Sequence, residues 1–119
     1  MKDILFLLKP DFEDQNIALH GERYYCPFCA AIEGVLAYYP QLRTQLEIIY
    51  VDFLRPRTEI VAQLGEQNQG CPVLVVNNLQ KLPFGFENLQ TIGDKKFIKS
   101  VPDLMAYLAM AYGVGTPHP

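Results

Sequence analysis

Apolar residues along this chain gather in short runs that alternate with stretches of helical spacing. Two of the runs are apolar almost throughout, which is typical of sheet strands covered on both faces, and a third is rich in β-branched and aromatic residues. Elsewhere apolar residues recur every three or four positions, which predicts amphipathic helices. The predicted strands are residues 3–8, 46–53 and 73–76, with a short fourth near 96–98, and the predicted helices are residues 28–38, 59–66 and a last one from Ser100 to about Tyr112.

The order of these elements is βαβαββα, which predicts an α/β protein with a mixed four-stranded sheet flanked by helices. Strands that alternate with helices favour parallel pairing through right-handed crossovers, so we expect the first three strands to be parallel. The last two strands follow one another directly, and we expect them to be antiparallel. Two long loops, residues 9–25 and 77–92, interrupt this order.

Length and charge narrow the class of protein. The 119 residues suffice for one domain, so we expect residues 1–119 to form a single domain. A net charge of -3 with no basic run argues against nucleic acid as a partner. Residues 4–8 are too short for a signal-peptide core, and no run is long enough to cross a bilayer. We therefore expect a cytoplasmic protein without a membrane partner, in a compartment where thiols stay reduced.

The candidate chemistry lies in Cys26-Pro27-Phe28-Cys29, which opens the first predicted helix. The positive end of the helix dipole stabilises a thiolate at that position, so Cys26 should be the more nucleophilic cysteine. Cys29 follows one turn later, within reach of a disulfide. The pair could be redox-active, could bind a metal, or could be buried without chemistry.

A third cysteine, Cys71, widens these alternatives. If it lies beside the pair, it could join thiol exchange or act as a third metal ligand. His20 would then be the candidate fourth ligand of a tetrahedral zinc set, Cys26, Cys29 and Cys71 being the others. A cysteine next to a strand is more often a small buried hydrophobe, and we favour that interpretation of Cys71.

The Cys-Pro-Phe-Cys motif and the order of elements resemble the thioredoxin fold, with glutaredoxins as the nearest form. Gly70-Cys71-Pro72-Val73 enters the third strand in a manner similar to these proteins, and the stretch from residue 69 to residue 108 also resembles the N-terminal domain of glutathione transferases. The whole chain looks like a family of uncharacterised bacterial thioredoxin-like proteins. The resemblance implies a cis proline at Pro72, which shapes a groove beside the cysteines and keeps metals off the pair.

The resemblance also implies candidate binding residues, each of which has a plainer explanation. Arg55, Arg57 and the helix start at Ser100 occupy regions that hold glutathione in related proteins, but we favour the plainer interpretation, a solvated loop for the two arginines and a helix cap for Ser100. Tyr25 and Phe28 could form an apolar rim for a partner chain or pack in a loop. Within 77–92, Phe84 and Phe86 could cover the site, form a homodimer contact or fold back onto the core.

We therefore predict a thiol–disulfide oxidoreductase in which Cys26 is the nucleophile and Cys29 the resolving thiol. Its substrate would be a protein or a low-molecular-weight disulfide, with glutathione as a co-substrate and no tightly bound cofactor. Two alternatives remain open: a non-catalytic binding module for a peptide or glutathione-like ligand, and a metal-binding protein.

Overall fold

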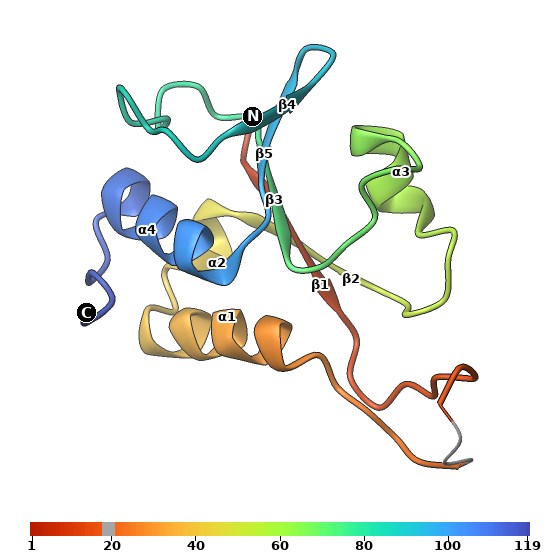
Figure 1. Ribbon diagram of the computed structural model, residues 1–119. Helices are drawn as coiled ribbons and strands as arrows, with labels where there is room; N and C mark the ends of the chain where they lie inside the picture. The colour runs from red at the N-terminus through yellow and green to blue at the C-terminus, as the bar shows by residue number, and fades with distance from the viewer. Residues whose placement is uncertain (18–20) are drawn as a thin grey trace.

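The computed structural model describes residues 1–17 and 21–119, and it has a central sheet with helices on both faces (Figure 1). The described parts of the first long loop, residues 9–17 and 21–25, project beyond the sheet next to the start of α1 (Figure 1). The elements in chain order are β1 (Ile4–Leu8), α1 (Pro27–Tyr38), α2 (Leu42–Gln45), β2 (Glu47–Val51), α3 (Thr58–Leu64), β3 (Val73–Val76), β4 (Gln90–Ile92), β5 (Lys95–Ile98) and α4 (Val101–Tyr112).

The sheet is mixed and has five strands, in the order β2-β1-β3-β5-β4. Strand β1 pairs with β2 in parallel and with β3 in antiparallel orientation, and β5 pairs with both β3 and β4 in antiparallel orientation. The prediction of an α/β protein with a mixed sheet and flanking helices is confirmed. The prediction that the first three strands are all parallel is wrong, because β3 runs against β1.

The count of four strands is also wrong, because the 77–92 segment ends in a strand. Residues Gln90–Ile92 pair with Lys95–Ile98 through a two-residue turn, with Gly93 at a positive φ of 59°. Such a turn suits a hairpin, since glycine adopts positive φ without strain. All three residues of β4 are exposed, so no burial pattern in the sequence marks this strand.

Side chains alternate along each strand and build one apolar layer on each face of the sheet. Leu5 and Leu7 pack with α1 and α4, whereas Ile4 and Phe6 pack with α3 on the other face. Leu74 in β3 faces the same side as Leu5. This period of two explains why β1 and β3, which are covered on both faces, are apolar throughout, and Figure 1 shows α1 and α4 together on one side of the sheet and α3 on the other.

A buried carboxylate ties the ends of the chain into this core. Asp3 is fully buried, and its Oδ1 accepts hydrogen bonds of 2.8 Å from the backbone N–H groups of Asn77 and Asn78. Its Oδ2 accepts from the hydroxyls of Tyr107 (2.6 Å) and Tyr112 (2.8 Å). Asp3 thereby joins the start of β1, the end of β3 and helix α4.

The two long loops pack differently. Phe12 in the first loop bridges to Tyr24 and stacks on Phe53, with ring centroids 4.3 Å apart. In the second loop Phe86 folds back onto the core, edge-on to Tyr107, whereas Phe84 is fully exposed. Within the described residues, no helix is long and apolar enough to cross a membrane.

Candidate functional site

The site begins at the junction between the first long loop and α1, where Cys26 is the N-cap residue. Its Sγ accepts a hydrogen bond of 3.3 Å from the backbone N–H of Cys29. Pro27 occupies the first helical position, where a missing N–H costs nothing. The sulfur of Cys26 therefore lies at the positive end of α1 and contacts the next cysteine of the motif, as the spacing predicts.

The two thiols differ in exposure. Cys26 is partly exposed, whereas Cys29 is 4% exposed and belongs to the core beneath it. The Sγ of Cys29 accepts a hydrogen bond of 3.4 Å from the backbone N–H of Leu8, the last residue of β1. Burial raises the pKa of the Cys29 thiol to about 12, and the hydrogen bond from Leu8 offsets this only in part. Cys29 is therefore a protonated thiol near neutral pH.

The turn before β3 lies against Cys26. The Cys26 thiol donates a weak hydrogen bond to the backbone carbonyl of Cys71, with a sulfur–oxygen distance of 3.9 Å. The Cys71–Pro72 peptide bond is cis, which is the geometry that the resemblance implies. Cys71 is partly buried, and it packs against the apolar layers of both faces. All three thiols are free.

Two pockets flank the cysteines. The first, which we name the Tyr50 pocket, has a volume of about 350 Å³. Its lining is mainly apolar and includes both cysteines of the motif: Leu8, Pro10, Tyr25, Cys26, Cys29, Ala30, Glu33 and Tyr50. At its polar edge, Glu33 accepts hydrogen bonds from the Tyr50 hydroxyl and, at 2.9 Å, from the Arg43 guanidinium.

The second pocket lies on the other side of the motif, and we name it the Ser100 pocket. It has a volume of about 290 Å³ and is lined by Phe28, Cys71, Pro72, Lys99, Ser100, Val101 and Pro102. The Ser100 Oγ accepts from the backbone N–H of Asp103 at 3.2 Å, so Ser100 caps α4 as the sequence predicts. The side chain of Ser100 thus has a structural role while its residue lines the pocket.

Arg57 lies in the interior, not in a solvated loop. It is 7% exposed, and its guanidinium donates to the carbonyl oxygens of Phe53 (3.0 and 2.7 Å) and Gln69 (2.7 Å). The Gln69 side chain accepts in turn from the Arg57 backbone N–H at 2.7 Å. Arg57 therefore fastens the loop after β2 to the segment that leads to Cys71. Arg55 is exposed and lines neither of the two pockets.

The metal-binding alternative finds no ligand set in the described part of the chain. Within residues 1–17 and 21–119, no group of three or more His, Cys, Asp or Glu side chains is placed so as to hold a metal ion. His20, the candidate fourth ligand, lies outside the described residues.

Three residues near the site were not expected from the sequence, namely Glu33, Tyr50 and Gln69. Glu33 follows Cys29 by four positions on α1, so helical spacing could have placed it on the same side. Tyr50 lies on β2, and the pairing of β2 with β1 sets it opposite Leu7. Gln69 carries no local signal, because its partner Arg57 is 12 positions away.

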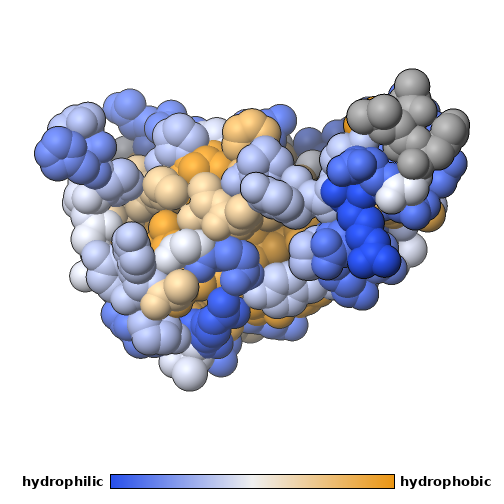
Figure 2. All heavy atoms as spheres, turned by 90° about the horizontal axis from the view of Figure 1, so that it is seen from below, coloured by the Kyte–Doolittle hydropathy of each residue, from blue (hydrophilic) through white to orange (hydrophobic). Residues whose placement is uncertain are grey.

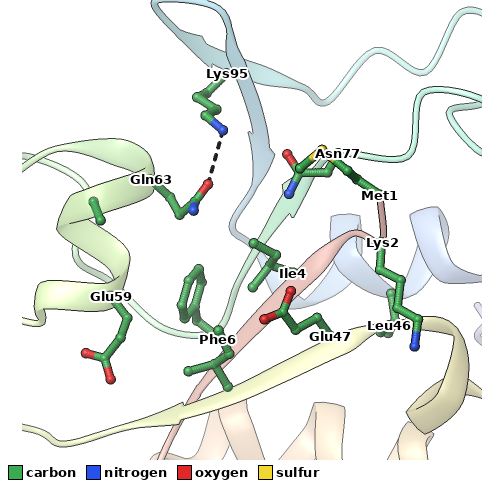
Figure 3. Close-up of a pocket in the computed structure, with 12 residues that line it drawn as sticks. Met1, Lys2, Ile4, Phe6, Leu46, Glu47, Glu59, Gln63, Asn77 and Lys95 are labelled. Atoms are coloured by element: carbon green, nitrogen blue, oxygen red, sulfur yellow. Dashed lines mark hydrogen bonds between the residues drawn. The ribbon is translucent and has the colours of Figure 1, made fainter.

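A larger cavity, of about 880 Å³, lies at the opposite end of the sheet. It opens between α3 and the starts of β1 and β2, and Figure 3 shows Lys95 donating to Gln63 across its rim at 3.2 Å. Ile4 and Phe6 form part of its lining. No cysteine lines this cavity, so the thiols and this space are separate features.

Fold and site together define a small α/β protein with a five-stranded mixed sheet and a close Cys26–Cys29 pair at the start of a helix. The family described as "Protein of unknown function (DUF3088)" matches residues 2–116, and the chain belongs to this family. Comparisons with curated proteins and with solved structures find no match.

Proposed function

We propose that this protein is a thiol–disulfide oxidoreductase. The observation that carries the proposal is the position of Cys26, which is partly exposed at the start of α1 and whose sulfur accepts a hydrogen bond from the N–H of Cys29. Helix starts stabilise thiolates, and thiolates are the nucleophiles of disulfide exchange. A buried second thiol one turn away supplies the partner that such a reaction needs.

The reaction has two exchange steps. The Cys26 thiolate attacks one sulfur of a substrate disulfide, forms a mixed disulfide and releases the other sulfur as a thiolate. Cys29 then loses its proton, attacks the Cys26 sulfur and releases the second substrate thiolate. The substrate gains two electrons and two protons, while the protein is left with a Cys26–Cys29 disulfide. An external thiol such as glutathione would return it to the dithiol.

The surroundings of Cys26 favour a substrate with apolar groups next to its disulfide. Tyr25 and Phe28, which flank the motif, are 64% and 62% exposed. Figure 2 shows apolar residues in the middle of the face on which α1 lies, with hydrophilic residues around them. We infer that a protein disulfide with apolar neighbouring side chains lies across Cys26 between the Tyr50 and Ser100 pockets.

The test is reduction of a small disulfide, with glutathione and glutathione reductase as the source of electrons, by wild type and matched variants. We expect turnover by the wild type, and loss of turnover in Cys26→Ser, because no other accessible thiolate lies at the helix start. Cys29→Ser should still form the mixed disulfide at Cys26, because only the second exchange step uses Cys29, and it cannot form the Cys26–Cys29 disulfide.

Cys71→Ser keeps both thiols of these two exchange steps, so it should still turn over. If Cys26→Ser is as active as the wild type, or if the wild type has no activity with glutathione or with a dithiol reductant, the proposal fails. Binding of glutathione disulfide without exchange would instead assign a binding module.

A further inference from the structure

Cys71 is a thiol at the site that the two exchange steps leave unused. Its carbonyl oxygen lies 3.9 Å from the Cys26 sulfur, and its residue lines the Ser100 pocket together with Phe28 of the motif. Cys26 is therefore flanked by a thiol-bearing residue on each side: Cys29 through its N–H and Cys71 through its C=O.

The Arg57 guanidinium, whose charge acts on Cys71, is held in place by hydrogen bonds. The Arg57 guanidinium makes hydrogen bonds with two backbone carbonyls, and among the described residues it forms no ion pair with a carboxylate. Its positive charge is therefore not neutralised by an acid and can act on a neighbouring anion. The hydrogen bond from the Arg57 guanidinium to the carbonyl of Gln69 holds this charge beside the backbone, two residues before Cys71 in the chain.

The charge of Arg57 acts on the Cys71 thiol. Burial raises the pKa of Cys71 to about 11, while the charge of Arg57 lowers it in part. Burial likewise raises the pKa of Cys29, to about 12. Cys71 is therefore a buried thiol like Cys29, with a nearby positive charge that favours its thiolate.

We propose that Cys71 is a second resolving thiol, which closes a Cys26–Cys71 disulfide as an alternative to Cys26–Cys29. This inference rests on the proposed function, because it needs Cys26 to form a mixed disulfide first. Arg57 is the positioning residue, since it fixes the segment that carries Cys71 and supplies the charge that favours its thiolate.

The chemistry is an intramolecular exchange with no further oxidant. Cys26 is first joined to one half of the substrate disulfide. The Cys71 thiolate attacks the Cys26 sulfur, the bond from Cys26 to the substrate breaks, and the substrate leaves as a thiolate that takes up a proton. Cys29 can then attack Cys26 and release Cys71 as a thiol, which moves the disulfide into the motif without net oxidation.

The experiment treats Cys29→Ser with glutathione disulfide, blocks free thiols with N-ethylmaleimide and digests the denatured protein with trypsin. Cys26 lies in the peptide of residues 24–43 and Cys71 in that of residues 58–81, so their disulfide links two separate peptides. We expect this linked pair, formed at least about tenfold faster than loss of glutathione from Cys29→Ser/Cys71→Ser, because an intramolecular thiol has a high effective concentration.

Three results would overturn the proposal in distinguishable ways. If Cys26 of Cys29→Ser stays bound to glutathione while Cys71 is blocked by N-ethylmaleimide, Cys71 is no resolving thiol and the proposed function still stands. If glutathione disulfide oxidises Cys26 in neither Cys29→Ser nor the wild type, the proposed function fails as well. If Cys29→Ser does not fold, Cys29→Ala and the wild type are mapped in the same way, and absence of the linked peptides in both counts against the proposal.

Discussion

The carboxylate of Asp3 and the hydroxyl of Tyr107 share a buried hydrogen bond of 2.6 Å across 104 positions of the chain. Because Tyr112 donates to the same oxygen, one carboxylate holds α4 against the start of β1. Tyrosine hydroxyls that donate to a buried carboxylate form strong, charge-assisted hydrogen bonds.

Replacing Asp3 should therefore weaken the fold. We expect Asp3→Asn to lower the free energy of unfolding by about 1–3 kcal/mol, because the amide nitrogen cannot accept from the two hydroxyls. Tyr112→Phe, the matched variant that removes one hydrogen bond, should cost about 1 kcal/mol. Urea unfolding followed by circular dichroism measures both. A loss below about 0.5 kcal/mol for Asp3→Asn would show that the carboxylate is replaceable.

The buried thiols predict a pH dependence of stability. The pKa of Cys29 is raised from 9.0 in the unfolded chain to about 12 by burial, so above pH 9 the unfolded state holds fewer protons than the folded state. The free energy of unfolding should thus fall as the pH rises from 9 towards 12, by at most about 1.4 kcal/mol per pH unit for this thiol.

Cys29→Ser isolates that contribution. Under reducing conditions its free energy of unfolding should fall less steeply with pH than that of the wild type. Tyr107 and Tyr112, whose pKa values burial also raises, titrate alike in both proteins and cancel in the difference. Equal slopes for the two proteins would mean that Cys29 is not a buried thiol in solution.

Arg57 and Arg55 make a matched pair for testing the hydrogen bonds that join Arg57 to Phe53 and Gln69. Arg57→Ala leaves the carbonyls of Phe53 and Gln69 without their donors and should lower the free energy of unfolding by about 2–4 kcal/mol. Arg55→Ala, at an exposed position, should change it by less than about 0.5 kcal/mol. Urea unfolding measures both changes. If the two variants lose the same free energy of unfolding, the guanidinium of Arg57 is solvated.

Ser100 offers a test that separates a cap from a binding group. Ser100→Ala removes the acceptor of the Asp103 N–H and should lower the free energy of unfolding by about 1 kcal/mol. If the hydroxyl only caps α4, kcat/KM for disulfide reduction should stay within about threefold of the wild type, less than 1 kcal/mol of transition-state stabilisation. A larger loss of kcat/KM without a loss of stability would assign the hydroxyl to substrate.

Much of the fold could be predicted from the sequence because the buried strands carry unbroken apolar runs. Residues 73–76 were predicted with the bounds that β3 has, and Ser100 was predicted as the cap of α4. The direction of β3 was not predictable in this way. An apolar run shows that a strand is covered on both faces, but it does not show which way the strand runs beside β1.

The site was predictable only where its residues are close in sequence. Cys26 and Cys29 meet because a helix start brings positions i and i+3 together. Arg57 follows an exposed Arg-Pro pair, and nothing local shows that its guanidinium is buried. Its guanidinium is hydrogen-bonded to the carbonyl of Gln69, which lies 12 positions later in the chain, beyond α3.

The most direct test of the central claim is a redox titration of the wild-type protein in glutathione buffers, with the disulfide mapped by peptide mass spectrometry. We predict a two-electron transition, in which the ratio of oxidised to reduced protein changes tenfold for about every 30 mV of potential. Its midpoint should lie between about -120 and -300 mV, and the disulfide should contain Cys26. Cys26→Ser should show no such transition. If wild-type Cys26 stays a free thiol across that whole range, the protein is no thiol–disulfide oxidoreductase.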